Sequence, residues 1–296
     1  MIFHRFFLFL LFVLAAAGGI VYAGWRWVRP RARPDPDLDS AAREVYFRTQ
    51  DGVLLRGVWL EGQQDYPGVV VCHGYFRSIA EPYQVALWLW ESGYNVLLFD
   101  FRGCGRSQPE FTTLGAKEML DVLAAVDWLK QQVSGPIGVY GISMGAVSAL
   151  MAATRSFDIA ALVLDSPYSR LDTVVEQRIR SLFRMPWLLP LGYLGLRAGE
   201  LISRNRVSEI RPIDYIATLS PRPIFIVYGD EDTLVPPSHA RELYELAVGE
   251  KEIWVARGSR HAMARHDYPE EYRQRLLDFL ERHLLQTTGS ASARSS

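Results

Sequence analysis

A serine between two glycines is the feature of this 296-residue chain that most directly indicates chemistry. The segment Gly141-Ile-Ser143-Met-Gly145 follows an apolar, β-prone run at 137–140 and precedes a run of small, helix-forming residues. A strand, a sharp turn and a helix form the setting in which G-x-S-x-G lifts a serine hydroxyl clear of a sheet. The two glycines remove Cβ atoms that would collide with neighbouring backbone. The pattern predicts Ser143 as a nucleophile. The alternative is a tight turn without chemistry.

A serine hydroxyl is a weak nucleophile, so it needs a base, and the base needs an acid that orients it. In this motif class the acid follows the serine in the chain, and the histidine follows the acid. The loop 229–236 comes directly after an apolar run at 223–228 and offers three acids, Asp230, Glu231 and Asp232. We favour Asp232, because the Leu-Val-Pro segment that follows it would anchor the loop. Asp165, at the end of an earlier predicted strand, is an outside candidate whose other role is to cap a turn.

The base should come from the loop after the last predicted strand, 252–255. His261 lies six residues beyond that strand, in a loop that opens with Gly258. His266 lies close to the last predicted helix, where we expect it to be solvated or to cap that helix. The other candidates are expected to be misplaced or, for the histidine that starts a helix, to lie at the surface: His4, His283 and His239. His261 is therefore the predicted base.

Acyl transfer also needs two N–H donors for the oxygen that becomes negatively charged. Met144 would start a helix, so its N–H is free of helical partners. The second donor should lie in the loop after the first buried strand, where Gly74 allows the backbone to turn and the amide of Tyr75 can point inward. We expect His73 to bond loop backbone rather than to act as a base.

The predicted elements would bring these residues to one place. Two β-patterned runs, 44–49 and 53–60, flank a strong hairpin turn at Asp51-Gly52. After them, strands and helices alternate. The predicted strands are 68–72, 94–99, 137–140, 159–164, 223–228 and 252–255, and the predicted helices are 81–92, 116–131, 238–248 and 269–285, besides the one that follows Ser143. This order predicts a mostly parallel sheet with helices on both faces. Right-handed crossovers place the carboxyl ends of the strands at one edge, where the site belongs.

Residues 171–220 interrupt the alternation. Pro186 and Pro190 break their helical patterning, and leucine and aromatic residues are frequent. We predict a helical cap that lies over the site within a domain that spans 43–285. Its composition favours an apolar acyl pocket.

The ends of the chain are predicted to lie outside this domain. Residues 6–23 carry no charge and would form a helix of about 27 Å, which is long enough to span a bilayer. Four arginines follow at 26–33, so the positive-inside rule predicts a single-pass anchor over 1–28 with a cytoplasmic catalytic domain. The alternative is a signal segment cleaved after Ala23, which would export the protein. Residues 29–42 would form a linker and 286–296 a disordered tail.

Composition narrows the choice of partners. The chain is 49% hydrophobic and 22% charged with a formal net charge of -1, so it has no basic excess that would indicate nucleic acid. Its two cysteines, Cys72 and Cys104, form neither a disulfide framework nor metal-ligand spacing. We expect no metal and no organic cofactor. The expected partners are a small-molecule ester or lipid-like substrate and, through the N-terminal helix, a membrane.

Taken together, the His73-Gly74 loop, the loop 100–107, the serine motif, Asp232-x-x-Val-Pro236 and His261 resemble the α/β-hydrolase fold family. The resemblance covers about residues 44–285. It is closer to the membrane-anchored α/β-hydrolase-domain proteins and their bacterial relatives, which include esterases, thioesterases and lipases. The catalytic domains of prolyl oligopeptidases look similar. The membrane-linked eukaryotic depalmitoylases among the α/β-hydrolase-domain proteins have a cysteine-rich N-terminus. This chain has no cysteine before Cys72, which argues against a role in palmitoyl cycling.

The resemblance implies a serine hydrolase of carboxylic esters. The implied residues are the nucleophile Ser143, the acid Asp232, the base His261 and the oxyanion amides of Tyr75 and Met144. A prolyl-oligopeptidase-type peptidase is an alternative that the absence of a propeller-sized N-terminal domain disfavours. A non-catalytic, membrane-tethered binding module is a third possibility, against which the complete set of serine, acid and histidine argues.

Overall fold

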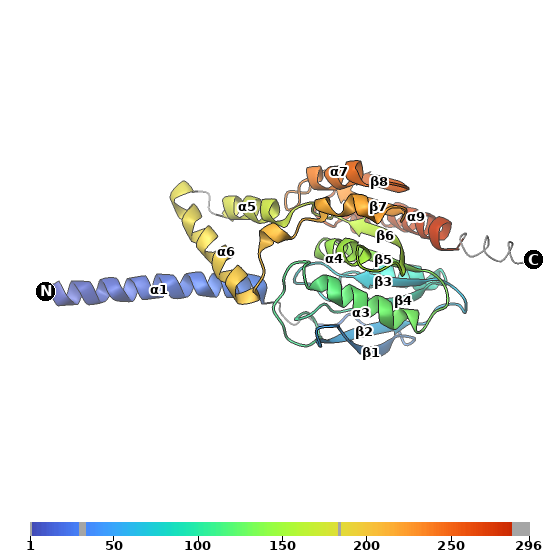
Figure 1. Cartoon of the computed structure of the whole chain (residues 1–296), viewed down its shortest axis with the longest axis horizontal. Helices are drawn as coiled ribbons and strands as arrows, with labels where there is room; N and C mark the ends of the chain where they lie inside the picture. Colours follow the sequence, from blue (N-terminus) through green and yellow to red (C-terminus); the bar gives the residue numbers. More distant parts are fainter. Residues whose placement is uncertain (1, 30–33, 183–184, 286–296) are drawn as a thin grey trace, which may run out of the picture.

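A computed structural model describes residues 2–29, 34–182 and 185–285. A single eight-stranded sheet forms the centre of a body from which one long helix, α1 (Ile2–Val28), extends outward (Figure 1).

The sheet has the strand order β1-β2-β4-β3-β5-β6-β7-β8. The predicted hairpin is present as β1 (Arg43–Arg48) and β2 (Leu54–Leu60), which pair antiparallel, and β2 also pairs antiparallel with β4. All other neighbours are parallel, as predicted. The remaining strands are β3 (Gly68–Cys72), β4 (Asn95–Phe99), β5 (Ile137–Ile142), β6 (Ile159–Asp165), β7 (Ile224–Gly229) and β8 (Lys251–Ala256).

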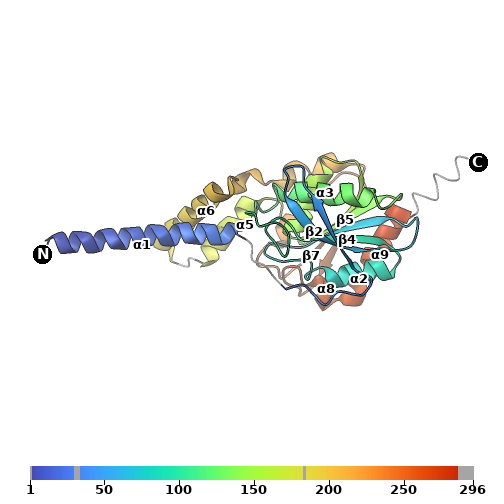
Figure 2. The ribbon, with the colours of Figure 1, turned by 90° about the horizontal axis from the view of Figure 1, so that it is seen from below.

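Helices cover both faces of the sheet (Figures 1 and 2). One face packs against α3 (Glu118–Lys130), α4 (Met144–Ala153) and α7 (Pro237–Leu246), and the other against α2 (Tyr83–Glu91) and α9 (Pro269–Leu280). Successive side chains of a strand point to opposite faces. In β3, Val70 accordingly packs on the face covered by α3, α4 and α7, and Val69 and Val71 pack on the face covered by α2 and α9. All three side chains are fully buried. The continuous apolar runs of the sequence therefore reflect a sheet that is buried on both sides.

The segment between β6 and β7 lies over the carboxyl edge of the sheet. It contains α5 (Leu171–Leu182) and α6 (Leu189–Ser203), together with short 3-10 turns. The prolines that break its pattern stand at the starts of helices, where a backbone N–H would have no partner within the helix, so its absence in proline costs little. Pro186 begins a 3-10 turn, and Pro190 is the second residue of α6. Two short elements complete the chain, α8 (Ala264–Asp267) and a π-helical turn (Glu281–Leu285).

The N-terminal helix requires a correction. Among the residues that the structure describes, none of the helices has the length and the apolar character that crossing a bilayer demands. The predicted membrane anchor, and the membrane localisation that depended on it, are therefore wrong. The last turns of α1 instead pack on one side against the body of the protein. They lie against α6, as Figure 2 shows from below, with Gly24 and Val28 buried in that contact.

The predicted linker also contacts the body where it is described. Asp35 pairs with the fully buried guanidinium of Arg56 at 2.9 Å, and the Asp39 N–H donates to the hydroxyl of Tyr83 at 2.6 Å. Residues 30–33 of that linker and the predicted tail, 286–296, lie outside the described residues.

Candidate active site

The structure brings Ser143, His261 and Asp232 together at the carboxyl edge of the sheet. His261 Nε2 lies 3.0 Å from Ser143 Oγ, and His261 Nδ1 lies 2.6 Å from Asp232 Oδ2. The Asp232 side chain is 1% exposed and that of His261 is 19% exposed. A buried carboxylate thus holds one ring nitrogen, while the other nitrogen faces the hydroxyl at the more open end of the chain of bonds.

The turn at Ser143 has the strained geometry that the motif predicts. Ser143 has φ 52° and ψ −112°, a backbone conformation that L-residues rarely adopt. Its N–H donates to the carbonyl of Asp165 at 2.7 Å, which ties the turn to the end of β6. A Cβ at Gly145 would lie 2.5 Å from the carbonyl oxygen of His73, so only glycine lets α4 approach the loop after β3 this closely.

Backbone N–H groups of the loop after β7 fix the orientation of the Asp232 carboxylate by binding one of its two oxygens. Asp232 Oδ1 accepts the N–H groups of Leu234 and Val235 at 2.9 and 2.8 Å, so Oδ2 remains for the histidine. Asp230, the competing acid, instead accepts the N–H of Gly258 at 2.6 Å and joins two loops.

Asp165, the outside candidate, has a supporting place. Its carboxylate accepts the hydroxyls of Ser166 at 2.9 Å and Tyr272 at 2.8 Å, and burial raises its pKa. Ser166 Oγ in turn accepts the N–H of Ala262 at 3.1 Å, directly beside His261. This chain of bonds connects the end of β6, which also binds the Ser143 N–H, to the loop of His261, and no signal in the sequence indicated it.

The other histidines differ in their surroundings. His266 lies in α8, is exposed, and lines the rim of the cavity described below. His239 was expected at the surface, and this is wrong: it is buried, and its Nδ1 lies 2.7 Å from Ser169 Oγ. His239 lies near the N-terminal end of α7, and that end of the helix packs against the sheet. The amphipathic pattern of the sequence did not indicate this burial.

His73 bonds loop backbone, as expected. Its Nδ1 bonds the carbonyl of Gly74 at 2.7 Å, and its Nε2 accepts the N–H of Phe101 at 3.0 Å. This pairing requires the neutral ring with its proton on Nδ1, and complete burial lowers the pKa of His73 in agreement. Glu81 secures the same loop by accepting the Gly74 N–H at 2.6 Å. The loop that carries Tyr75 is therefore fixed at its beginning.

Both residues that carry the predicted oxyanion amides line the cavity of Ser143. Met144 is the first residue of α4, so its N–H has no partner within the helix. Tyr75 lies in the loop after β3 and lines the same cavity as Ser143. The cavity has a volume of about 870 Å³.

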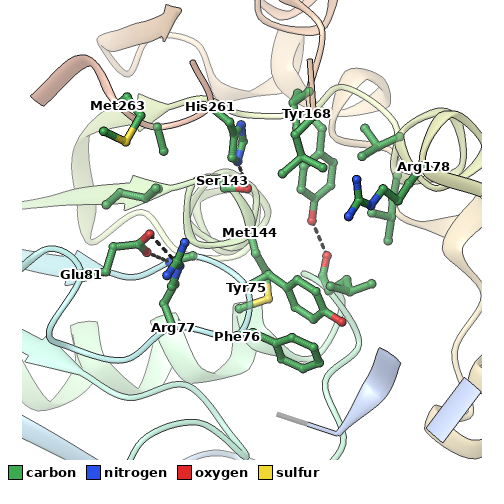
Figure 3. A pocket seen from close by; sticks show the side chains of 18 of the residues that line it. Tyr75, Phe76, Arg77, Glu81, Ser143, Met144, Tyr168, Arg178, His261 and Met263 are labelled. Atoms are coloured by element: carbon green, nitrogen blue, oxygen red, sulfur yellow. Dashed lines mark hydrogen bonds and ion pairs between the residues drawn. The ribbon is translucent and has the colours of Figure 1, made fainter. Parts of the chain in front are cut away.

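The two sides of this cavity differ in chemistry. Figure 3 shows Arg77 and Glu81 on one side of Ser143 and Tyr168 and Arg178 on the other. Arg77 pairs with Glu81 at 3.4 Å. On the cap side, apolar side chains dominate, namely Leu171, Val174, Val175 and Leu182 of α5 with Leu234 and Val235. Trp27, from the last turn of α1, also lines the cavity, and the sequence gave no sign of this.

Neither cysteine reaches the site. Cys72 and Cys104 are both buried in the core. In the described part of the chain, no group of three or more His, Cys, Asp or Glu side chains is placed to hold a metal ion.

Comparisons with known proteins agree with this fold. The family model Hydrolase_4, described as serine aminopeptidase S33, matches residues 67–209. An esterase of Pyrococcus furiosus, Pf2001, superposes with a TM-score of 0.73 and 33% identity, over 87% of this chain and 98% of that one.

Two bacterial relatives extend the similarity. The uncharacterised protein Rv2307c of Mycobacterium tuberculosis is 31% identical over 291 residues, which is 93% of each chain. The uncharacterised protein YqkD of Bacillus subtilis is 30% identical over 221 residues, which is 72% of this chain and 70% of that one. With its eight-stranded sheet, the serine turn and these relatives, the chain belongs to the α/β-hydrolase fold family.

Proposed function

We propose that this protein is a serine hydrolase that cleaves carboxylic esters through an acyl-enzyme. The observation that carries the proposal is the unbroken series of bonds from Asp232 through His261 to Ser143, which ends at the wall of the large cavity. Similarity to an esterase structure at 33% identity supports the same reaction.

In the first half of the reaction, Ser143 Oγ attacks the ester carbonyl carbon while His261 Nε2 takes the hydroxyl proton. The carbonyl oxygen becomes negatively charged and is stabilised by the N–H groups of Tyr75 and Met144. The tetrahedral species then collapses. The bond to the leaving alkoxide breaks, and His261 returns the proton to it, so that an alcohol departs and an acyl-serine remains.

The second half repeats these roles with water. His261 removes a proton from a water molecule as the oxygen attacks the acyl-serine, and the same two amides hold the oxyanion. Collapse releases the carboxylic acid and returns the proton to Ser143 Oγ. Asp232 keeps the ring in the required tautomer and stabilises its positive charge throughout, because it is fixed by two amides and almost completely buried.

The walls of the cavity suggest which part of the substrate lies where. The aliphatic side chains of α5 fit an apolar acyl group, and the ion pair of Arg77 with Glu81 on the other side fits a polar leaving group. Esters or thioesters of apolar acids are therefore the proposed substrates.

The test is covalent labelling combined with turnover in the full chain. A fluorophosphonate should label the wild type, and aryl esters from acetyl to palmitoyl should be hydrolysed. Ser143→Ala should abolish labelling and lower kcat/KM on the order of 10⁴-fold or more, with the melting temperature little changed. Ser148→Ala is the matched control. Its hydroxyl bonds the Met144 carbonyl one turn along the same helix, so labelling should persist. Retained ester hydrolysis in a folded Ser143→Ala protein would contradict the proposal.

Peptide hydrolysis is the competing activity, since the matching family model carries the name of an aminopeptidase. Turnover of an ester and an anilide with the same acyl group separates the two activities. Faster anilide turnover would favour the peptidase. If a folded wild type took no label at all, the fold would serve as a binding module.

A further inference from the structure

The last turn of α1 lies against the active site rather than apart from it. Trp27 lines the cavity, and its carbonyl accepts a hydrogen bond from the hydroxyl of Tyr75. One residue on, the Val28 carbonyl accepts the N–H of Thr112 at 2.8 Å. The final carbonyls of a helix have no partner within it, so they are available for such bonds. Two loops of the body thereby hold the end of α1.

A close helix crossing fixes the same end from the other side. A Cβ on Gly24 would lie 2.6 Å from both the Gly195 carbonyl oxygen and the Gly199 amide nitrogen of α6. The backbones of α1 and α6 therefore touch at this point, as the two views of the ribbon agree (Figures 1 and 2). Trp27 follows one turn later and packs against the apolar cluster that includes Val175 of α5.

Tyr75 connects this end of α1 to the reacting atoms. Its N–H is the proposed oxyanion donor, and its hydroxyl is held at the Trp27 carbonyl. Figure 3 shows the ring extending from the serine toward the end of α1 (pale blue), stacked on Phe76 at a centroid distance of 3.9 Å. Phe76 itself has φ 55°, so the loop turns sharply directly after Tyr75. The bond to Trp27 is thus a second fixed point for this loop, beyond the one that His73 supplies.

We propose that the end of α1 is part of the substrate site, with Trp27 in two roles. Its indole limits the apolar side of the cavity and selects the length of the acyl group, and its carbonyl positions Tyr75 for oxyanion binding. The inference rests on the proposed ester hydrolysis and deepens it. A chain without α1 would keep Ser143, His261 and Asp232 but would lose this wall and this anchor.

The first test measures acyl selectivity in the full chain. Trp27→Ala opens the cavity toward α6, so the ratio of kcat/KM for a dodecanoyl ester to that for a butyryl ester should rise roughly fivefold or more. Trp25→Ala is the matched control, because Trp25 stacks on Tyr22 at 5.8 Å and does not line the cavity. Its ratio should stay at the wild-type value.

The second test separates positioning from folding. Tyr75→Phe keeps the ring and the amide but removes the hydroxyl, so kcat per fluorophosphonate-labelled site should fall about tenfold, with KM within about twofold. A purely structural role would reduce the labelled fraction and leave kcat per labelled site unchanged, and this result overturns the positioning role.

The outcomes keep the two proposals apart. A wild type that hydrolyses esters, together with a folded Trp27→Ala whose selectivity ratio is unchanged, overturns the inference alone. An equal shift in Trp25→Ala does the same. If Trp27→Ala fails to fold, Trp27→Leu, which retains apolar packing, must shift the ratio in the same direction. A wild type that hydrolyses no ester overturns both proposals.

Discussion

The loops at the carboxyl edge of the sheet and the helices above them are built on different principles. At the edge, buried polar groups have defined partners, as Asp232 has with two amides and one histidine. Above it, the segment that carries α5, a 3-10 turn (Pro186–Leu188) and α6 leaves large apolar side chains in solvent. Trp187 is 72% exposed and Leu201 is 79% exposed.

This difference fits two separate roles in the proposed site, one for the edge loops and one for the helices above them. A buried polar group is costly to leave unpaired, so the edge loops have one favourable arrangement and hold the reacting atoms in place. Apolar contacts are not directional, so the helices above can change side chains and reshape the cavity with less effect on the reacting groups. The loop of Tyr75 belongs to both regions, since His73 fixes its start and α1 contacts its tip.

The largest expected effect on kcat comes from a substitution of Asp232, the proposed acid at the edge of the sheet. Asp232→Asn should lower kcat by about 10³ to 10⁴-fold, because an amide cannot stabilise the imidazolium and favours the wrong tautomer. Ester turnover at saturating substrate measures this loss. Asp230→Asn is the control in the same loop. It retains an oxygen to accept the Gly258 N–H, and its kcat should stay within about threefold of the wild type. Equal losses in the two variants would contradict the assignment of the acid.

A pair of glycine substitutions tests the comparison through stability. Gly145→Ala would place a Cβ 2.5 Å from the His73 carbonyl oxygen, and backbone cannot easily move away, so the free energy of unfolding should fall by about 2 to 4 kcal/mol. In α6, the one contact within 4 Å that a Cβ on Gly195 would make with the described residues is with the Ala23 Cβ, at 3.9 Å. Gly195→Ala should therefore stabilise the protein by up to about 1 kcal/mol, because alanine loses less backbone entropy in a helix.

Denaturant unfolding of both variants provides the measurement. The comparison would fail if Gly195→Ala destabilised the protein as much as Gly145→Ala. That result would mean that the region above the sheet edge is as tightly constrained as the edge itself.

The sequence allowed the edge to be predicted far better than the region above it. The buried β-branched runs, such as residues 68–72, have one favourable placement in a parallel sheet, and chain order then assigns Ser143, Asp232 and His261 to its carboxyl edge. The geometry agrees, with contacts of 3.0 and 2.6 Å along the chain of bonds. These residues could be found because local pattern and topology determine their positions.

The contribution of α1 could not be found in this way. The uncharged run at 6–23 was interpreted as a membrane span, whereas none of the described helices is long and apolar enough to be one. The approach of Gly24 to α6 joins residues far apart in the chain, and no local period encodes it. His239 was misplaced for the same reason, since its burial depends on Ser169, 70 residues away.

The smallest expected effect is on the pH dependence of the free energy of unfolding, and it concerns His73 at the edge of the sheet. Burial lowers the pKa of His73 below its ordinary value of 6.5, with Asp100 partly opposing the shift. Above pH 6.5 the ring is neutral in both the folded and the unfolded chain, and its contribution to stability is fully present. As the pH falls below that value, the unfolded chain takes up a proton that the folded protein refuses, so stability is lost.

The loss from His73 is at most about 1.4 kcal/mol for each pH unit below its unfolded pKa. Denaturant unfolding at pH 7.5 and pH 5.0 should therefore show a smaller drop in His73→Gln than in the wild type, although the variant is less stable at both. His239, whose pKa burial also lowers, titrates in both proteins and cancels from the difference. An identical drop in both proteins would mean that His73 is protonated in the folded state. Its Nε2 could then not accept the Phe101 N–H, and the loop of Tyr75 would lack the anchor at its start on which the division between edge and helices depends.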